Sequence, residues 1–67
     1  MTKKEFVKMQ KRYNDMWDER DYCITQGYDN RAEQILDRLY EIDLFIRETT
    51  GYSLFDTYIE QIEQGII

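Results

Sequence analysis

The residues of this sequence that could carry chemistry are its carboxylates and one thiol. Cys23 is the only cysteine and histidine is absent, so no imidazole can exchange a proton near neutral pH and no neighbour activates the thiol. Cys23 instead continues an apolar helical stripe, where we expect it to be a small buried side chain. We therefore predict that the chain is not an enzyme and needs no cofactor.

Two sets of carboxylates recur at helical spacing and could bind a hard metal ion. One set is Glu33, Asp37 and Glu41, and the other is Asp15, Asp18 and Asp21. These acids fall mostly outside the apolar stripes, and arginines lie close to several of them in sequence. We therefore expect solvated charged surfaces and no metal site.

Carboxylates spaced along helices could also imitate a phosphate backbone and occupy the basic groove of a nucleic-acid-binding protein. The acids considered for this role are Asp15, Asp18, Glu19 and Asp21, followed by Glu48, Asp56, Glu60 and Glu63. The alternative is that they only keep the chain soluble, because a net charge of −5 is ordinary for a small domain.

Tyrosine is abundant, with six in 67 residues. Tyrosine is enriched at protein–protein interfaces because its ring buries a large rigid area and its hydroxyl stays polar. Tyr13 is expected in the core. The interface candidates are Tyr22, Tyr28, Tyr40 and Tyr52, together with Leu44. The alternative is that these residues cap the ends of a small bundle.

The charges are segregated along the chain. Residues 1–12 hold five basic residues and one acidic residue, a net charge of +4, whereas residues 13–67 hold four basic and thirteen acidic residues, a net charge of −9. Direct binding to nucleic acid through a broad basic face is not expected, so a protein partner with a basic surface is favoured. No apolar run is long enough for a membrane span or signal peptide, and a cytoplasmic location is expected.

Helices must position these residues, and the sequence predicts three of them, at residues 2–26, 30–49 and 53–64. Thr2 and Ser53 are expected to cap the first and third helices, with Glu5 and Asp56 completing capping boxes. Asp29 or Asn30 is expected to cap the second helix, with Glu33 closing a box with Asn30. Gly27, Gly51 and Gly65 stand where the helical patterns stop.

The apolar spacing predicts how the helices pack. A regular 3,4 spacing marks a buried seam along the second helix at Ala32, Ile35, Leu39, Ile42, Ile46 and Thr49. The short connection around Gly27 makes the two long helices antiparallel. A second apolar line, at Leu36, Tyr40 and Leu44, is expected to lie under the third helix. The prediction is one all-α domain over residues 1–67: a helical hairpin with a shorter C-terminal helix, a small three-helix bundle.

Two resemblances add to this interpretation. The segment Leu39-Tyr40-Glu41-Ile42-Asp43 resembles the Ser-Gln-Glu-Leu-Asp motif on the second helix of small sporulation-type aspartyl-phosphate phosphatases; Glu41 and Asp43 match, Ile42 is conservative, and Leu39 and Tyr40 depart from the motif. In size and composition, the chain is similar to small acidic antagonists of phages and mobile elements, including anti-CRISPR proteins and DNA mimics.

Three hypotheses follow. The leading one is a non-enzymatic protein-binding module, an inhibitor of the phage or mobile-element type that occupies a basic site of a nucleic-acid-handling protein. The second is a homodimer whose hairpins form a larger helical bundle with a structural or regulatory role. The third, implied by the phosphatase resemblance, is a regulator acting on the aspartate of a response regulator.

Overall fold

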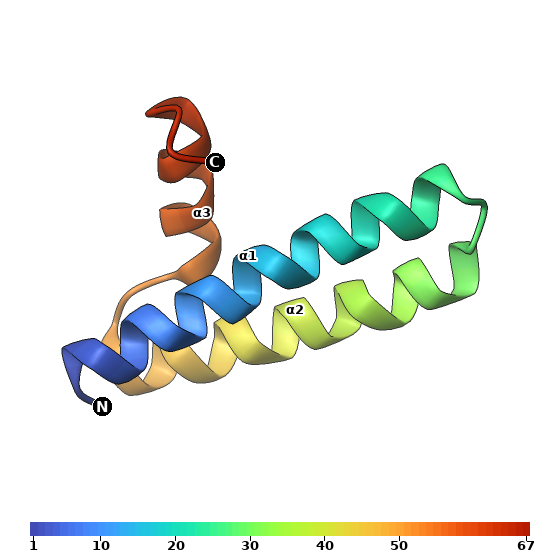
Figure 1. Cartoon of the computed structure of the whole chain (residues 1–67). Helices are drawn as coiled ribbons and strands as arrows, with labels where there is room; N and C mark the ends of the chain where they lie inside the picture. Colours follow the sequence, from blue (N-terminus) through green and yellow to red (C-terminus); the bar gives the residue numbers. More distant parts are fainter.

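Two long helices form an antiparallel hairpin, and a third, shorter helix crosses it at a steep angle (Figure 1). The computed structural model describes residues 1–67, with α1 at Lys3–Thr25, α2 at Asp29–Thr50 and α3 at Leu54–Glu63. The all-α prediction, with two long helices and a shorter C-terminal one, is confirmed. Every observed bound lies one residue from the expected range.

Two of the three helix starts carry the predicted side-chain caps. The Thr2 hydroxyl accepts a hydrogen bond from the Glu5 backbone N–H at 3.2 Å, and the Ser53 hydroxyl accepts one from the Asp56 N–H at 3.2 Å. The reciprocal bonds from the Glu5 and Asp56 side chains do not form, so each capping box is half made. These caps satisfy N–H groups that have no partner within the helix.

The predicted cap of the second helix is wrong. The N-cap residue is Tyr28, without a side-chain hydrogen bond, and Asp29 already lies inside the first turn. Gly27 adopts a left-handed conformation with φ 81°, and the Tyr28 N–H donates to the Cys23 carbonyl at 2.7 Å. Because this tight closure of α1 uses only residues 26–28, α2 begins before Asn30 can act as a cap.

The core lies mainly along the seam between α1 and α2. Its buried apolar residues are Tyr13, Cys23, Ala32, Ile35, Leu39, Ile46 and Leu54. The predicted seam of α2 is therefore largely confirmed, as is the burial of Cys23, which is 2% exposed. At the edges of the seam, Ile42 is half-buried and Thr49 is exposed.

The expected position of the third helix is wrong. Helix α3 was to cover Leu36, Tyr40 and Leu44, but Tyr40 and Leu44 remain 61% and 54% exposed. After Gly51 ends α2, α3 runs across α1 and away from the hairpin instead of lying along it (Figure 1). Beyond the end of α3, Ile66 and Ile67 stay exposed. None of the three helices combines the length and apolarity needed to cross a membrane.

Candidate protein-binding groove

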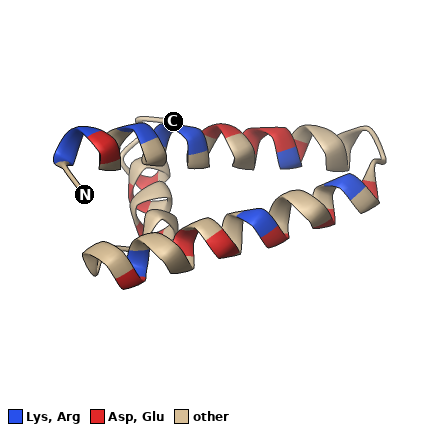
Figure 2. Cartoon of the chain, turned by 90° about the horizontal axis from the view of Figure 1, so that it is seen from below, with Lys and Arg blue, Asp and Glu red and all other residues tan.

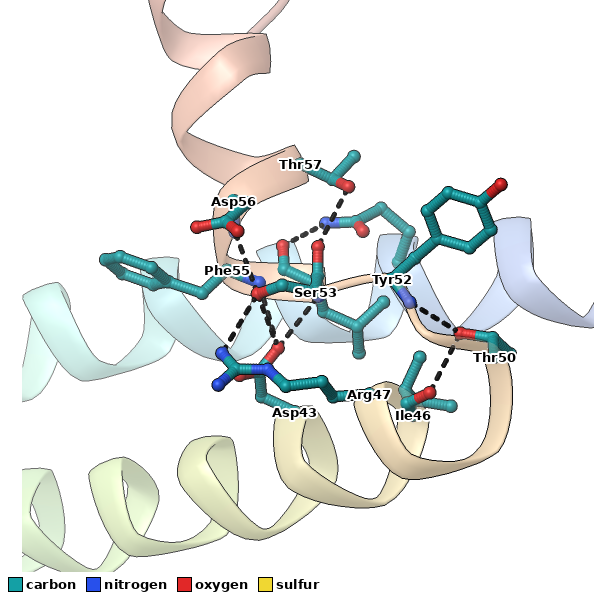
Figure 3. A network of polar contacts seen from close by, with 11 residues as sticks. Asp43, Ile46, Arg47, Thr50, Tyr52, Ser53, Phe55, Asp56 and Thr57 are labelled. Carbon is teal, nitrogen blue, oxygen red and sulfur yellow. Dashed lines mark hydrogen bonds and ion pairs between the residues drawn. The ribbon is translucent and has the colours of Figure 1, made fainter.

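The start of α3 is fixed by the carboxylate of Asp43, which projects from α2 (Figure 3). Its Oδ1 accepts hydrogen bonds from the backbone N–H groups of Leu54 (2.8 Å) and Phe55 (3.2 Å) and from the Ser53 hydroxyl (3.1 Å). Its Oδ2 pairs with Arg47 at 2.8 Å. A buried carboxylate is stable only when it is bonded in this way, and Asp43 is 7% exposed. It therefore serves as a second cap for α3, supplied by a different helix.

A polar ladder ties α3 to α1. The Gln10 side-chain amide donates to the Leu54 carbonyl at 3.2 Å and to Asn14 Oδ1 at 2.9 Å. Asn14 in turn donates from Nδ2 to Gln61 Oε1 at 2.7 Å. Gln10 is 5% exposed, so the ladder lies at the edge of the core. Neither Gln10 nor Asn14 was singled out from the sequence.

Aromatic rings complete the joint between α1 and α3, with Trp17 at its centre. The Trp17 ring stacks on Tyr58, with centroids 5.6 Å apart and planes 9° apart. Phe55 lies 5.8 Å from Trp17, and Tyr13 meets it edge-on at 6.3 Å. The Arg20 guanidinium covers the ring at 5.5 Å. The contacts of Trp17 with Tyr58 and Phe55 hold α3 at its angle to the hairpin, and Tyr13 and Arg20 support the Trp17 ring from within α1.

The angle between the hairpin and α3 encloses a groove with a volume of about 540 Å³. Three helices form its walls. It is lined by Tyr13, Trp17, Tyr40, Asp43, Leu44, Arg47 and Phe55, and we call it the aromatic groove. Its apolar surface and small number of fixed polar groups are typical of binding sites that are formed before the partner arrives.

The predicted interface residues do not gather in one place. Tyr40 and Leu44 both line the aromatic groove. Tyr28 lies at the connection of the hairpin, and Tyr52 lies at the opposite end, where its ring meets Phe6 edge-on at 6.3 Å. Tyr22 is exposed on α1. Two residues of this groove were therefore predicted from the sequence, and its other walls were not.

The predicted acidic residues are all exposed, but they face different sides of the molecule. Asp15 and Glu19 lie in a second groove, between α1 and α2, where Glu19 pairs with Arg31 at 2.9 Å. Asp18 and Asp21 lie nearer α3, and their negative charges add to the effect of burial in raising the pKa of the Tyr58 hydroxyl. Only this second pair belongs to the side of the aromatic groove.

The predicted acids of α3 lie apart from those of α1. Glu60 and Glu63 are exposed on α3, and the Glu60 side chain accepts a hydrogen bond from Gln64 at 3.1 Å. Carboxylates and the thiol do not gather anywhere in a group of three that could hold a metal ion.

The two acids that match the phosphatase motif lie on opposite sides of the hairpin. Asp43 Oδ1 caps α3 and Asp43 Oδ2 pairs with Arg47, whereas Glu41 is exposed in the second groove. The two side chains therefore do not form a common site. Comparison with protein-family models, with curated proteins and with solved structures finds no match for this chain.

Proposed function

We propose that this chain is a non-enzymatic protein-binding module whose aromatic groove receives a partner protein with a basic surface. The observation that carries the proposal is the exposure of Tyr40 and Leu44 beside Trp17 and Phe55 in a groove built from three helices. Large aromatic side chains that are already held in place dominate the binding energy of protein interfaces, because ordering them on binding costs little entropy.

The charge of the molecule supports a basic partner. The net charge of residues 13–67 is −9, and Figure 2 shows acidic positions along both long helices beyond the basic first turns of α1. Exposed Glu33 and Glu48 lie seven residues before Tyr40 and four after Leu44, which places them near the same side of α2. Asp18 and Asp21 add charge from α1. Such a field attracts basic proteins and accelerates their association.

Proteins that handle nucleic acid present basic surfaces to the phosphate backbone. A chain seated on such a surface excludes the nucleic acid, so the module acts as an inhibitor in this proposal. The inhibition is measured as displacement of a labelled DNA or RNA from the partner when the chain is added. Unchanged nucleic-acid binding at saturation would remove the inhibitory part of the proposal and leave the binding part.

The binding site is tested with paired substitutions on opposite sides of α2. A partner is first isolated from host extract on the immobilised chain, and its affinity for the purified chain is then measured. Tyr40→Ala should weaken binding by about 30-fold or more, as expected for a hot-spot residue. Phe45→Ala is the control, because Phe45 is equally exposed (60% against 61% for Tyr40) and lies outside the groove. Equal losses for both variants would rule out the aromatic groove.

The electrostatic part is tested with two double variants of equal charge. Asp18→Asn with Asp21→Asn removes acids near α3, and Asp15→Asn with Glu19→Gln removes the same charge from the second groove. The first pair should weaken binding more than the second, because Coulomb attraction falls with distance and is screened by salt. Equal effects would mean that the partner responds only to net charge.

A further inference from the structure

The hairpin has a second hollow on the side turned away from α3. This groove has a volume of about 660 Å³ and shares no lining residue with the aromatic groove. Glu19 lines it, whereas Trp17 lines the aromatic groove, and residues two positions apart on a helix point about 200° apart. Figure 2 views the hairpin from below, with α3 behind the two long helices. This hollow is the second groove described above, and from here on we call it the charged groove.

The floor of the charged groove is apolar and continues towards the open end of the hairpin. Met16 and Ile35 lie within it. An adjoining hollow of about 280 Å³ contains Met9, Ile42 and Phe45 and shares the residues Arg12, Arg38 and Glu41 with the charged groove. Phe45 is 60% exposed, and neither α3 nor the chain ends cover it. An apolar strip therefore follows the α1–α2 seam on this side.

The walls of the charged groove carry positive and negative side chains in nearly equal number. Three arginines, Arg12, Arg31 and Arg38, face four acids, Asp15, Glu19, Asp37 and Glu41. The groove therefore has a net charge of −1 in a chain whose net charge is −5. Among these residues only Arg31 and Glu19 form an ion pair, so Arg12 and Arg38 remain available to another molecule.

The mixed charge of the groove favours some binding partners over others. A strongly basic partner would meet three arginines, and a strongly acidic one would meet four carboxylates. A second copy of the chain carries the same alternation at the same spacing, and a twofold axis makes every contact occur twice. Because the lining of the charged groove is nearly neutral, two copies can approach there without the repulsion that a net charge of −5 imposes on the chain as a whole.

We propose that two copies of this chain associate through the charged groove and its adjoining hollow, forming a bundle of four long helices. Two helices, each about 10 Å across in a molecule 37 Å long, offer a face on the order of 700 Å², close to the roughly 800 Å² that each partner buries in a specific interface. The aromatic grooves then point outwards on opposite sides. The dimer does not depend on the proposed function.

The test compares two exposed aromatic residues on opposite sides of α2. Sedimentation equilibrium of the wild-type chain should show a dimer at micromolar concentration. Phe45→Glu should raise the dimer dissociation constant by about 30-fold or more, and circular dichroism should remain unchanged because Phe45 is exposed. Tyr40→Glu adds the same charge outside the interface and should leave the dimer intact. A monomeric wild-type chain, or a loss of dimer by Tyr40→Glu alone, would overturn the proposal.

Charge exchange gives a positive test. A chain with Arg12→Glu and Arg38→Glu and a chain with Asp15→Arg and Glu41→Arg should each be monomeric, because each face then carries mostly one sign. When mixed, they should form a one-to-one complex. Adding Phe45→Glu to either chain should weaken that complex, which separates specific docking from general attraction. A mixture that stays monomeric would contradict the assigned interface.

Discussion

At the level of single residues, the carboxylate of Asp43 links the last turns of α2 to the start of α3. It accepts from two backbone N–H groups and one hydroxyl, whereas its ion pair involves an Arg47 side chain that is 56% exposed. Because exposed ion pairs contribute little, the hydrogen bonds to the start of α3 account for most of its effect. Asp43 is one of the two acids that match the phosphatase motif, and each of its carboxylate oxygens therefore has a structural contact.

Replacing Asp43 should destabilise the fold by an amount that depends on how many acceptor oxygens the substitution removes. Asp43→Ala leaves the buried Leu54 N–H without an acceptor and should lower the free energy of unfolding by about 3 kcal/mol. Asp43→Asn keeps one acceptor oxygen and should cost about half as much. Urea denaturation measures both, with Glu48→Ala as a control at an exposed acid of α2, where a change within about 0.5 kcal/mol is expected. If Asp43→Ala matched this control, Asp43 would not anchor α3.

At the level of elements, the hairpin was predictable from local pattern and the direction of α3 was not. The 3,4 spacing of α2 and the left-handed Gly27 fix two antiparallel helices. The direction of α3 depends on hydrogen bonds from Gln10 and Asn14 to residues 44 and 47 positions away. Neither side chain belongs to an apolar stripe, so no periodic pattern marks it.

The aromatic groove was only half predictable for the same reason. Tyr40 and Leu44 form an apolar line that one neighbouring helix cannot cover, and this was visible in the sequence. Trp17 and Phe55 fit the apolar faces of their helices, and hydropathy does not distinguish a covered ring from the wall of a groove. Their roles became apparent only once α3 was placed across α1.

The joint between α1 and α3 should weaken in alkali. Burial, followed by the charges of Asp21 and Asp18, raises the pKa of Tyr58 above its ordinary 10.0, and burial likewise raises the pKa of Tyr13. Above about pH 10 the unfolded chain loses these protons first, so the free energy of unfolding should fall as pH rises through the raised pKa values. Below about pH 10 this contribution is fully present.

Urea denaturation between about pH 8 and about pH 11 measures this fall. Tyr58→Phe should make it shallower, with Tyr13 still contributing. Tyr22→Phe, at a tyrosine that is 60% exposed, should leave it unchanged. An identical pH dependence in wild type and Tyr58→Phe would mean that the Tyr58 hydroxyl is not protected in the folded state.

At the level of the whole molecule, the chain exposes more surface than its mass requires. A folded monomer of 8.3 kDa is expected to expose about 4,600 Å², whereas this chain exposes 5114 Å². Its radius of gyration, 12.4 Å, also exceeds the roughly 11 Å expected for 67 residues. The projecting α3 and the open sides of the hairpin account for this excess, and both proposed interfaces would cover part of it.

Salt should therefore act on stability and on binding in opposite directions. Only two ion pairs stabilise the monomer, and the side chains of one are 63% and 48% exposed, whereas residues 13–67 carry a net charge of −9. At low ionic strength the Debye length of about 30 Å approaches the 37 Å length of the molecule, so most of these acids repel one another. Sodium chloride screens that repulsion, and the free energy of unfolding should rise by on the order of 0.5–1 kcal/mol between about 10 mM and about 150 mM salt.

The same screening weakens attraction to a basic partner, so affinity for that partner should fall over the range in which the chain becomes more stable. Urea denaturation at constant chain concentration measures how the free energy of unfolding changes with salt. Calorimetric titration with the partner measures how affinity changes with salt. If stability fell with salt, the ion pairs would outweigh the repulsion between acids. If affinity did not respond to salt, the aromatic groove would bind its partner through apolar contacts alone, and the requirement for a basic surface would be withdrawn.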